Sequence, residues 1–264
     1  MNIYRSLNDI TKYIEDHLEE DVSYVALARI LGTNEYTMKR IFSLLTGIGL
    51  SEYIRKRRLS CAGFDLCGGK WKIIDLAVKY RYENATSFSR AFEHFHGVKP
   101  SEVDTDTALK NFPRIVFQED VFIPTSMKYE IVSYPEFNLY GKGISTDNAH
   151  IAMDAPRFFY EFEKKYYDKY GSVPFGMITY DTEREESRCY YCLYDREAEG
   201  MERIYIPSSK WLKFQISSQN AKEIHDVSQQ FYHEFLPSCK FNLRELPELE
   251  YYHDGVTDFL VAID

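Results

Sequence analysis

The sequence predicts a chain of two domains. The first is an all-α domain with a duplicated helix-turn-helix, and the second is an α+β domain of two pseudo-symmetric β-α-β-β halves. Three observations lead to this prediction. The composition changes part-way along the chain, a helical pattern recurs after about fifty residues, and a strand–helix–strand–strand pattern recurs in the second part.

The change in composition marks the domain boundary. Residues 1–108 hold 15 Lys and Arg against 15 Asp and Glu, whereas residues 109–264 hold 17 against 26. The second part therefore carries the whole net charge of −9, and it is also the richer in aromatic side chains. We expect domains at 1–108 and 126–264, with a linker at 109–125.

Composition and motifs argue against several classes of protein. No apolar run is long enough for a membrane helix, and the start, "MNIYRSLNDITKYIEDH", lacks the apolar core of a signal peptide, so we expect a cytoplasmic protein. Cys189 and Cys192 would point to opposite faces of a strand, which disfavours metal binding. No phosphate-cradling glycine loop or nucleophile motif occurs in the sequence. We expect no metal, no cofactor and no catalytic residue.

Two segments of the first domain repeat one pattern. Residues 34–47, "NEYTMKRIFSLLTG", and residues 84–97, "NATSFSRAFEHFHG", each begin at Asn and end at Gly. Each places apolar residues at i, i+3, i+4 and i+7, as a capped amphipathic helix does. Segments 27–32 and 76–81 supply a preceding helix for each copy, and a basic helix over 50–66 joins the two copies.

A polar stripe lies opposite the apolar face of each repeated helix. One interpretation is a plain helical bundle whose stripe meets only water. A bundle, however, gives no reason to repeat Arg40 and Arg90 at the same place outside the core. Helix-turn-helix units set their second helix in the major groove, where outward side chains reach base edges. The repeat therefore predicts binding to double-stranded DNA.

Residues 5–103 resemble the DNA-binding domain of AraC/XylS-type transcriptional regulators. The resemblance rests on both turns, on the connector "YIRKRRL" and on the closing "GVKPSE". It implies duplex DNA as a partner and activation of transcription through contact with RNA polymerase. The base-contacting positions that it implies are Tyr36, Lys39 and Arg40 in the first repeated helix, and Ala85, Thr86, Ser89 and Arg90 in the second. Arg57 in the connector is expected to contact phosphate.

The second turn departs from the family pattern. The family usually has Gly before an aromatic residue, whereas this chain has Arg81 before Tyr82. A left-handed arginine would cost on the order of 1 kcal/mol. Arg81 therefore adopts positive φ, gains a phosphate contact, or sits in a turn of slightly different shape. After "PSE", Val103 and Asp104 replace the usual aromatic and basic residues, which would remove one contact to the DNA backbone.

The second domain repeats a β-α-β-β pattern. In the first half, residues 127–140 predict a strand, 155–171 a helix, and 173–181 and 188–195 two strands. The second half predicts one or two strands over 201–217, a helix over 220–237 and two strands at the end of the chain. A groove is expected where the two halves meet.

Residues 126–264 resemble the GyrI-like effector-binding domain, a small-molecule-binding module. The resemblance rests on "IYIPSSKWLKFQI", "FYHEFLPSCKFNLRELPELEYYHDG" and "DFLVAID". It implies a cleft for a cationic or amphipathic small molecule, with Glu250 as the charge partner. Tyr252 shares the face of Glu250 by strand alternation. The candidate wall residues are Trp211, Tyr180, Tyr134 and Phe137, and Glu130 and Glu136 are the next candidates for the charge partner.

Three functions stay open from the sequence. The leading interpretation is a ligand-responsive DNA-binding transcriptional regulator. A second is hydrolase activity in the C-terminal domain, with Glu250 and a neighbouring tyrosine as general base and acid. A third is a protein-docking module that inhibits a partner. For Glu250 itself, the alternative to a cation site is an ordinary place on the outer face of the sheet.

Overall fold

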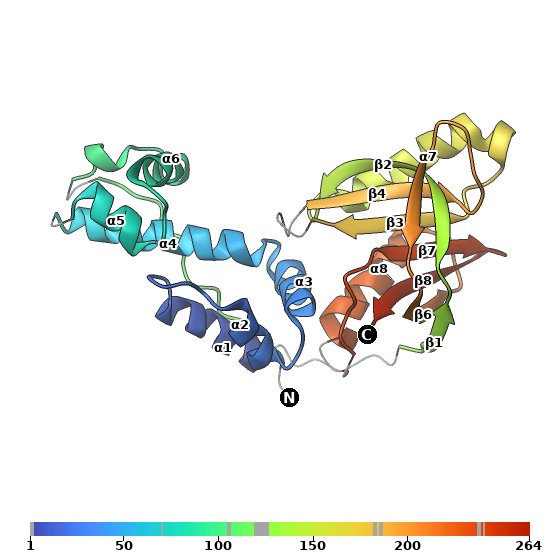
Figure 1. Cartoon of the computed structure of the whole chain (residues 1–264), viewed down its shortest axis with the longest axis horizontal. Coiled ribbons are helices and arrows are strands. Elements are labelled where there is room, and N and C mark those ends of the chain that lie inside the picture. The colour runs from blue at the N-terminus through green and yellow to red at the C-terminus, as the bar shows by residue number, and fades with distance from the viewer. Residues whose placement is uncertain are drawn as a thin grey trace. The chain divides into compact units, whose positions relative to one another are not determined.

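The computed structural model describes residues 3–69, 71–104, 107–118, 127–181, 184, 187–236, 239 and 241–264. By their contacts the residues form two compact units (Figure 1). The first, Met1–Glu35 with Leu50–Asp120, is called the helical unit below, and the second, Tyr36–Gly49 with Val121–Asp264, the sheet unit. Within the described ranges, no helix has the length and apolar character needed to cross a membrane.

Six α-helices and a short 3-10 helix make up the N-terminal part that the structure describes. In chain order they are α1 Ile3–Asp16, α2 Tyr24–Leu31, α3 Glu35–Thr46, α4 Leu50–Cys67, α5 Ile73–Lys79, α6 Ala85–His96 and η1 Pro100–Glu102. All belong to the helical unit except α3, whose residues from Tyr36 onward are grouped with the sheet unit. The predicted connector, 50–66, is α4, and its side chains Tyr53, Leu59 and Ala62 are fully buried.

The ends of α6 form as its sequence predicts. The side chain of Asn84 accepts a hydrogen bond from the backbone nitrogen of Ser87, which satisfies one free donor of the first turn. Gly97 ends the helix at φ 87°, a left-handed conformation that suits glycine. Phe88 and Phe92 are fully buried and pack into a core whose members come from α4, α5 and α6.

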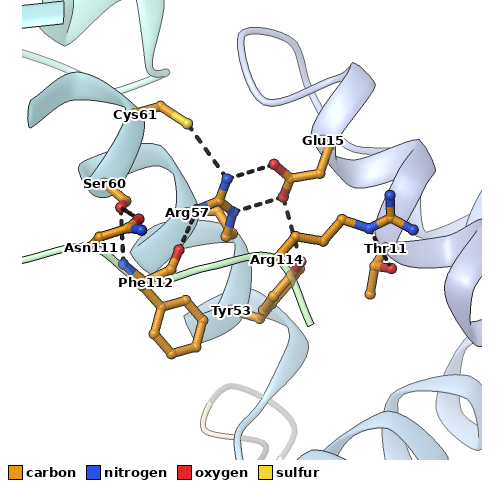
Figure 2. A network of polar contacts seen from close by, with 9 residues as sticks. All are labelled: Thr11, Glu15, Tyr53, Arg57, Ser60, Cys61, Asn111, Phe112 and Arg114. Atoms are coloured by element: carbon orange, nitrogen blue, oxygen red, sulfur yellow. Dashed lines mark hydrogen bonds and ion pairs between the residues drawn. The ribbon is translucent and has the colours of Figure 1, made fainter. Parts of the chain in front are cut away.

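A segment expected to be a linker packs instead on α1 and α4. The Ser60 hydroxyl donates a hydrogen bond to the side-chain oxygen of Asn111 and accepts one from the backbone nitrogen of Phe112 (Figure 2). The Phe112 carbonyl accepts a hydrogen bond from Arg57. Asn8 bonds both the backbone nitrogen and the carbonyl of Phe117. Residues 109–118 of the expected 109–125 linker are thus bound to the helical unit, because their backbone groups find partners there. Residues 119–125 lie outside the described part of the chain.

The second turn adopts the strained conformation that the sequence raised as one possibility. Arg81 has φ 64°, in the left-handed region that glycine occupies at low cost. Its guanidinium forms a 2.6 Å ion pair with Asp21, but both side chains are largely exposed. An exposed ion pair contributes only about 0–1 kcal/mol, so it does little to offset the strain.

The described residues of the sheet unit form an antiparallel sheet that is accompanied by two further helices besides α3. Its strands are β1 Glu130–Tyr134, β2 Phe137–Asp147, β3 Phe175–Tyr180, β4 Ser187–Tyr194, β5 Glu202–Ile206, β6 Ser209–Ile216, β7 Glu248–His253 and β8 Val256–Ile263. The helices are α7 Ile151–Tyr170 and α8 Ala221–Gln230, the latter continued by a π-helical turn, η2 Phe231–Phe235. The expected single strand over 127–140 is two strands, β1 and β2, separated by Pro135 and Glu136.

The strand order confirms the pseudo-twofold repeat. The order is β1-β6-β8-β7-β3-β4-β2-β5, so β2-α7-β3-β4 and β6-α8-β7-β8 meet along β3 and β7. The outermost strands are exchanged between the halves. β1 precedes β2 in the chain but pairs with β6, and β5 precedes β6 but pairs with β2. Each half therefore supplies an edge strand of the other, which ties the halves together beyond their common seam.

The two faces of the sheet bury different cores. One face buries a hydrophobic cluster that includes Leu139, Met177, Trp211 and Leu249. The other face packs against α7 through Phe162, Tyr190 and Tyr194. By strand alternation, Glu248, Glu250 and Tyr252 of β7 face the second side, opposite Leu249. The helix-covered face is therefore the one that carries the polar groups of β7.

The left-handed Arg81 gives a testable prediction. Arg81→Gly should raise the free energy of unfolding by up to about 1 kcal/mol, because glycine adopts positive φ without the Cβ clash. Asp21→Asn serves as the matched control. It removes the ion pair but leaves the backbone at Arg81 as it is, and it should change stability by less than about 1 kcal/mol. Denaturant unfolding followed by far-ultraviolet circular dichroism measures both, and an Arg81→Gly protein less stable than its parent would contradict the strain.

Candidate functional site

The predicted DNA-facing positions of α6 are accessible. Thr86 and Arg90 are exposed, and Ala85 and Ser89 are half-buried on the same side of the helix. The Ser89 hydroxyl donates to the carbonyl of Ala85 within the helix, so the stripe presents one arginine and small groups to solvent. This is the shape and chemistry that a helix needs to approach base edges closely.

The corresponding positions of α3 are covered. Tyr36 and Lys39 are half-buried, and Arg40 is buried, with only 5% of its surface exposed. The Thr37 hydroxyl accepts a hydrogen bond from the backbone nitrogen of Leu243, and Asn148 donates to the hydroxyl of Ser43. The expectation of an open reading face on α3 is therefore not met in this structure, because residues of the sheet unit lie against it.

Arg57 also differs from the expectation of a phosphate contact. Its guanidinium bonds both carboxylate oxygens of Glu15, at 2.8 and 2.7 Å, and the carbonyl of Phe112 (Figure 2). This guanidinium joins α1, α4 and the 107–118 segment. The geometry gives Arg57 a role within the fold, and the bidentate pair suits an arginine better than a lysine.

A cavity of about 580 Å³ opens on the helix-covered face of the sheet. Residues of the N-terminal part of α7, of the whole length of α8 and of β3, β4 and β7 line it. Its apolar wall includes Ile151, Ala155, Pro156, Phe159, Val173, Pro174, Ile178 and Ile224, together with Leu44 of α3. Its polar groups include Glu163, Tyr180, Arg188, Tyr190, His225, Glu250, Tyr252 and His253. A cavity that combines an apolar wall with convergent polar groups is the usual form of a small-molecule site.

Glu250 lies at this cavity, as predicted, and not on an outer face. It is 8% exposed, and its carboxylate accepts a hydrogen bond from the Tyr252 hydroxyl, which lies 3.3 Å from the hydroxyl of Tyr190. Gly176 pairs with Glu250 across β3 and β7, and a Cβ there would come within 2.7 Å of the Glu250 carboxylate. The absence of a side chain at Gly176 thus makes room for the carboxylate and the two tyrosines.

A second buried carboxylate, Glu248, lies two residues before Glu250 on the same strand face. It is 2% exposed and accepts hydrogen bonds from Arg40, at 2.6 Å, and from Tyr232. The guanidinium of Arg40 lies over the rings of Tyr180 and Tyr232. Arg188 of β4, also buried, lies over the Tyr180 ring, 4.1 Å from its centroid.

Two of the predicted aromatic residues line the cavity and three do not. Tyr180 and Tyr252 line it. Trp211 is fully buried in the hydrophobic core on the opposite face, and Phe137 packs against the same core. Tyr134 is 37% exposed on the edge strand β1. Alternation assigns each of these three to a face, but only the packing of the strands decides which face meets the cavity.

The next candidates for the charge partner are likewise away from the cavity. Glu130 forms an ion pair with Lys213 across β1 and β6, and Glu136 accepts from Tyr205. Sequence reasoning missed Glu248 and Arg188. Alternation of "ELEYY" places Glu248 beside Glu250, and alternation of "RCYYC" places Arg188 beside Tyr190, so period two was the available signal.

Burial sets the protonation of this cluster. Desolvation raises the pKa of Glu250 to about 7, against the smaller opposing effect of the Tyr252 hydrogen bond. Burial also raises the pKa of Glu248, while the charges of Arg40 and Arg188 oppose that shift. Burial and the nearby Arg40 lower the pKa of Arg188 to about 10. The Glu250 carboxyl is therefore only partly ionised near pH 7 unless a cation stabilises its charge.

Comparison with known proteins agrees with both resemblances. Residues 27–105 match the family model of a helix-turn-helix domain, and residues 130–263, about half of the chain, match that of the integron-associated effector binding protein. The HTH-type transcriptional activator AarP of Providencia stuartii is 32% identical over 95 residues, which cover 36% of this chain and 70% of the relative. The Transposon Tn10 TetD protein of Escherichia coli is 33% identical over 95 residues, covering 36% and 69%.

Among solved structures, the integron cassette protein VCH_CASS2 of Vibrio cholerae is similar to the C-terminal part in its fold. It is 16% identical, with 52% of this chain and 95% of that protein covered, at a TM-score of 0.42.

The raised pKa of Glu250 predicts how stability depends on pH. Between the ordinary glutamate pKa and about 7, the folded protein binds more protons at this site than the unfolded chain does. The fold therefore loses stability as pH rises through this window. Glu250→Gln removes this titration. The free energy of unfolding of the variant, relative to that of the parent, should therefore rise by on the order of 1–3 kcal/mol between about pH 5 and about pH 8.

A single tryptophan can report this unfolding. The chain has two, and in a Trp71→Phe background the buried Trp211 reports on the sheet unit alone. The control is Glu223→Gln, which alters an exposed glutamate of α8 and should change stability little. A difference between Glu250→Gln and its parent that stays constant with pH would mean that Glu250 is not desolvated as described.

Proposed function

The chain belongs to the AraC-type helix-turn-helix transcriptional regulators with a GyrI-like effector-binding domain, and we propose that it senses a cationic, partly apolar molecule at Glu250. It is a ligand-responsive DNA-binding regulator, in line with its relatives among HTH-type activators. The observation that carries the effector class is a buried carboxylate in a cavity with an apolar wall and aromatic rings. We also infer a cytoplasmic location and activation through contact with RNA polymerase.

The chemistry around Glu250 favours a cation over an anion or a neutral molecule. A carboxylate taken out of water costs free energy until a positive charge neutralises it. The rings of Phe159, Tyr190 and Tyr252 line the same cavity and can add ring-face attraction to a cation. The apolar wall supplies the burial that an organic cation needs, so inorganic ions are the poorer fit.

The exposed stripe of α6 is proposed as a base-reading surface. Thr86, Ser89 and Arg90 are the residues that would reach base edges in the major groove. Tyr36, Lys39 and Arg40 of α3 would serve in the same way once α3 is uncovered. Arg57 is proposed to hold the fold and to act on DNA only through the position of α4.

Hydrolase activity is the second candidate. A carboxyl whose pKa is raised to about 7 beside two tyrosine hydroxyls is suited to general acid–base chemistry. The relatives that are transcriptional regulators favour binding instead.

The DNA-reading role predicts a sequence-specific loss for Arg90→Ala. Removing one arginine contact to a base edge should weaken binding to a selected target duplex by about 1–3 kcal/mol and relax base preference at one position. Binding to a scrambled duplex should fall much less. Fluorescence anisotropy with both duplexes at one fixed salt concentration measures the two affinities.

Arg157→Ala is the control for Arg90→Ala, because Arg157 is an exposed arginine of α7. It should leave both affinities unchanged. Equal losses on target and scrambled duplexes for Arg90→Ala would show that Arg90 contributes charge only and reads no base.

The effector site predicts a charge-selective loss for Glu250→Gln. The substitution keeps the volume and a hydrogen-bonding oxygen but removes the charge. Affinity for tetraphenylphosphonium, an aromatic cation, should fall at least tenfold, about 1.4 kcal/mol. Affinity for triphenylphosphine oxide, a neutral relative of similar shape, should barely change. Isothermal titration at about pH 8, where the Glu250 carboxyl is ionised, measures both.

Glu223→Gln removes the same charge from an exposed place on α8 and should leave both affinities at the parental value. Undiminished cation binding by Glu250→Gln would mean that the charge partner is another group of the cavity, Glu163 being the next candidate. Turnover of ester substrates that Glu250→Gln abolishes would favour the hydrolase instead.

A further inference from the structure

The sheet unit contains a second cation site, and a side chain of the protein fills it. The guanidinium of Arg40 lies among Glu248, Tyr180 and Tyr232, and its Nη2 donates to the Glu248 carboxylate at 2.6 Å and to the Tyr232 hydroxyl. Arg40 belongs to α3, and Glu248 belongs to β7. We call these three partners of Arg40 the Glu248 site.

The Glu248 site has the chemistry of a specific arginine receptor. Two aromatic rings lie against the guanidinium, which suits its flat, weakly hydrated shape. The carboxylate is almost wholly desolvated, so loss of the arginine would leave an uncompensated charge inside the protein. An arginine in an incidental surface contact would not have both a buried carboxylate and two aromatic rings as partners.

The residues next to Arg40 on α3 are held as well. Thr37 and Ser43 lie one turn to either side, and both form hydrogen bonds with residues of the sheet unit, Leu243 and Asn148. The spacing of Thr37, Arg40 and Ser43 follows one face of a helix. This face adjoins the stripe of Tyr36, Lys39 and Arg40 that is proposed to read DNA, so docking and base reading compete for the same side of α3.

The Glu248 site is continuous with the effector cavity. Tyr180, Arg188 and Leu44 all line the cavity, and Tyr180 also contacts Arg40. Glu248 and Glu250 lie on one face of β7, separated by a single residue. A cation bound at Glu250 would therefore sit in the same low-dielectric environment as the guanidinium of Arg40, where like charges repel strongly.

We propose that the Glu248 site is a docking site for the arginine of the recognition helix α3, and that a cationic effector in the adjoining cavity releases it. This inference rests on the proposed function. A docked Arg40 cannot reach DNA, so the docked state lacks one of the two reading helices. Because the effector and the docked arginine disfavour each other, effector binding shifts the population toward a free α3 and raises affinity for DNA. By linkage, DNA raises affinity for the effector by the same factor.

Glu248→Gln in the 264-residue chain tests the docking. The substitution keeps the shape of the site but removes the charge that holds Arg40. Without a cation, its affinity for the target duplex should exceed that of the parent at least fivefold, a typical coupling between sites. Saturating tetraphenylphosphonium should raise the affinity of the parent by a similar factor and should leave that of Glu248→Gln unchanged.

Glu223→Gln is the matched control, because it removes a charge from an exposed place on α8 and leaves the Glu248 site intact. It should keep both the low affinity of the parent for DNA and the response to tetraphenylphosphonium. A DNA affinity of Glu248→Gln equal to that of the parent, while both proteins bind tetraphenylphosphonium, would overturn the docking but leave the proposed effector site standing. A parent that does not bind tetraphenylphosphonium at all would overturn the proposed effector site, while a higher DNA affinity for Glu248→Gln would still support the docking.

A measurement on the parent needs no substitution and covers the case in which Glu248→Gln fails to fold. Hydrogen exchange of the α3 amides, Glu35–Thr46, should become faster when tetraphenylphosphonium saturates the cavity, because the contacts at Thr37, Arg40 and Ser43 are lost. Exchange of the α6 amides, Ala85–His96, should not change. Exchange in α3 that is unchanged or slower would overturn the release by a cation.

Discussion

The sheet unit is organised around the cost of burying two carboxylates on one strand. Glu248 and Glu250 point to the helix-covered face of β7, where little water reaches them. A desolvated carboxylate must be neutralised or paired, and the two residues meet this demand differently. Glu248 is paired with Arg40, whereas Glu250 has hydroxyl partners and a raised pKa. The charge of one acid is paired within the protein, and the charge of the other is neutralised only by a bound cation or by a proton.

The surrounding fold serves this arrangement. Gly176 leaves space beside Glu250 that any side chain would fill, and Tyr190 and Tyr252 close that space with hydroxyl groups. The exchange of β1 and β5 between the two halves fixes the seam at which β3 and β7 meet. Since a one-residue slip would turn both carboxylates toward the opposite core, the register of this seam is also the main constraint on the site. Stability and ligand chemistry thus depend on the same pairing.

The helical unit uses its charges in a different way. Two arginines of α4 are bound within the unit. Arg57 forms an ion pair with Glu15, and Arg58 donates hydrogen bonds to the carbonyls of Leu18 and Glu20. These contacts tie α4 to α1 and to the residues that follow α1, in addition to the buried hydrophobic core. They leave the exposed face of α6 as the place where sequence can be read, with Arg90 as its main charged group.

The sequence by itself determined what depends on local periodicity. The helix faces with their caps at Asn84 and Gly97, the β-α-β-β repeat and the place of Glu250 and Tyr252 on one strand face all follow from spacing of 3.6 or 2 residues. Only the tertiary structure decided which distant groups meet. Spacing could not show that Trp211 faces away from the cavity, that residues 109–118 bind to α1 and α4, or that Arg40 fills the Glu248 site. Those outcomes depend on strand order and on contacts between residues far apart in the chain, which no local pattern encodes.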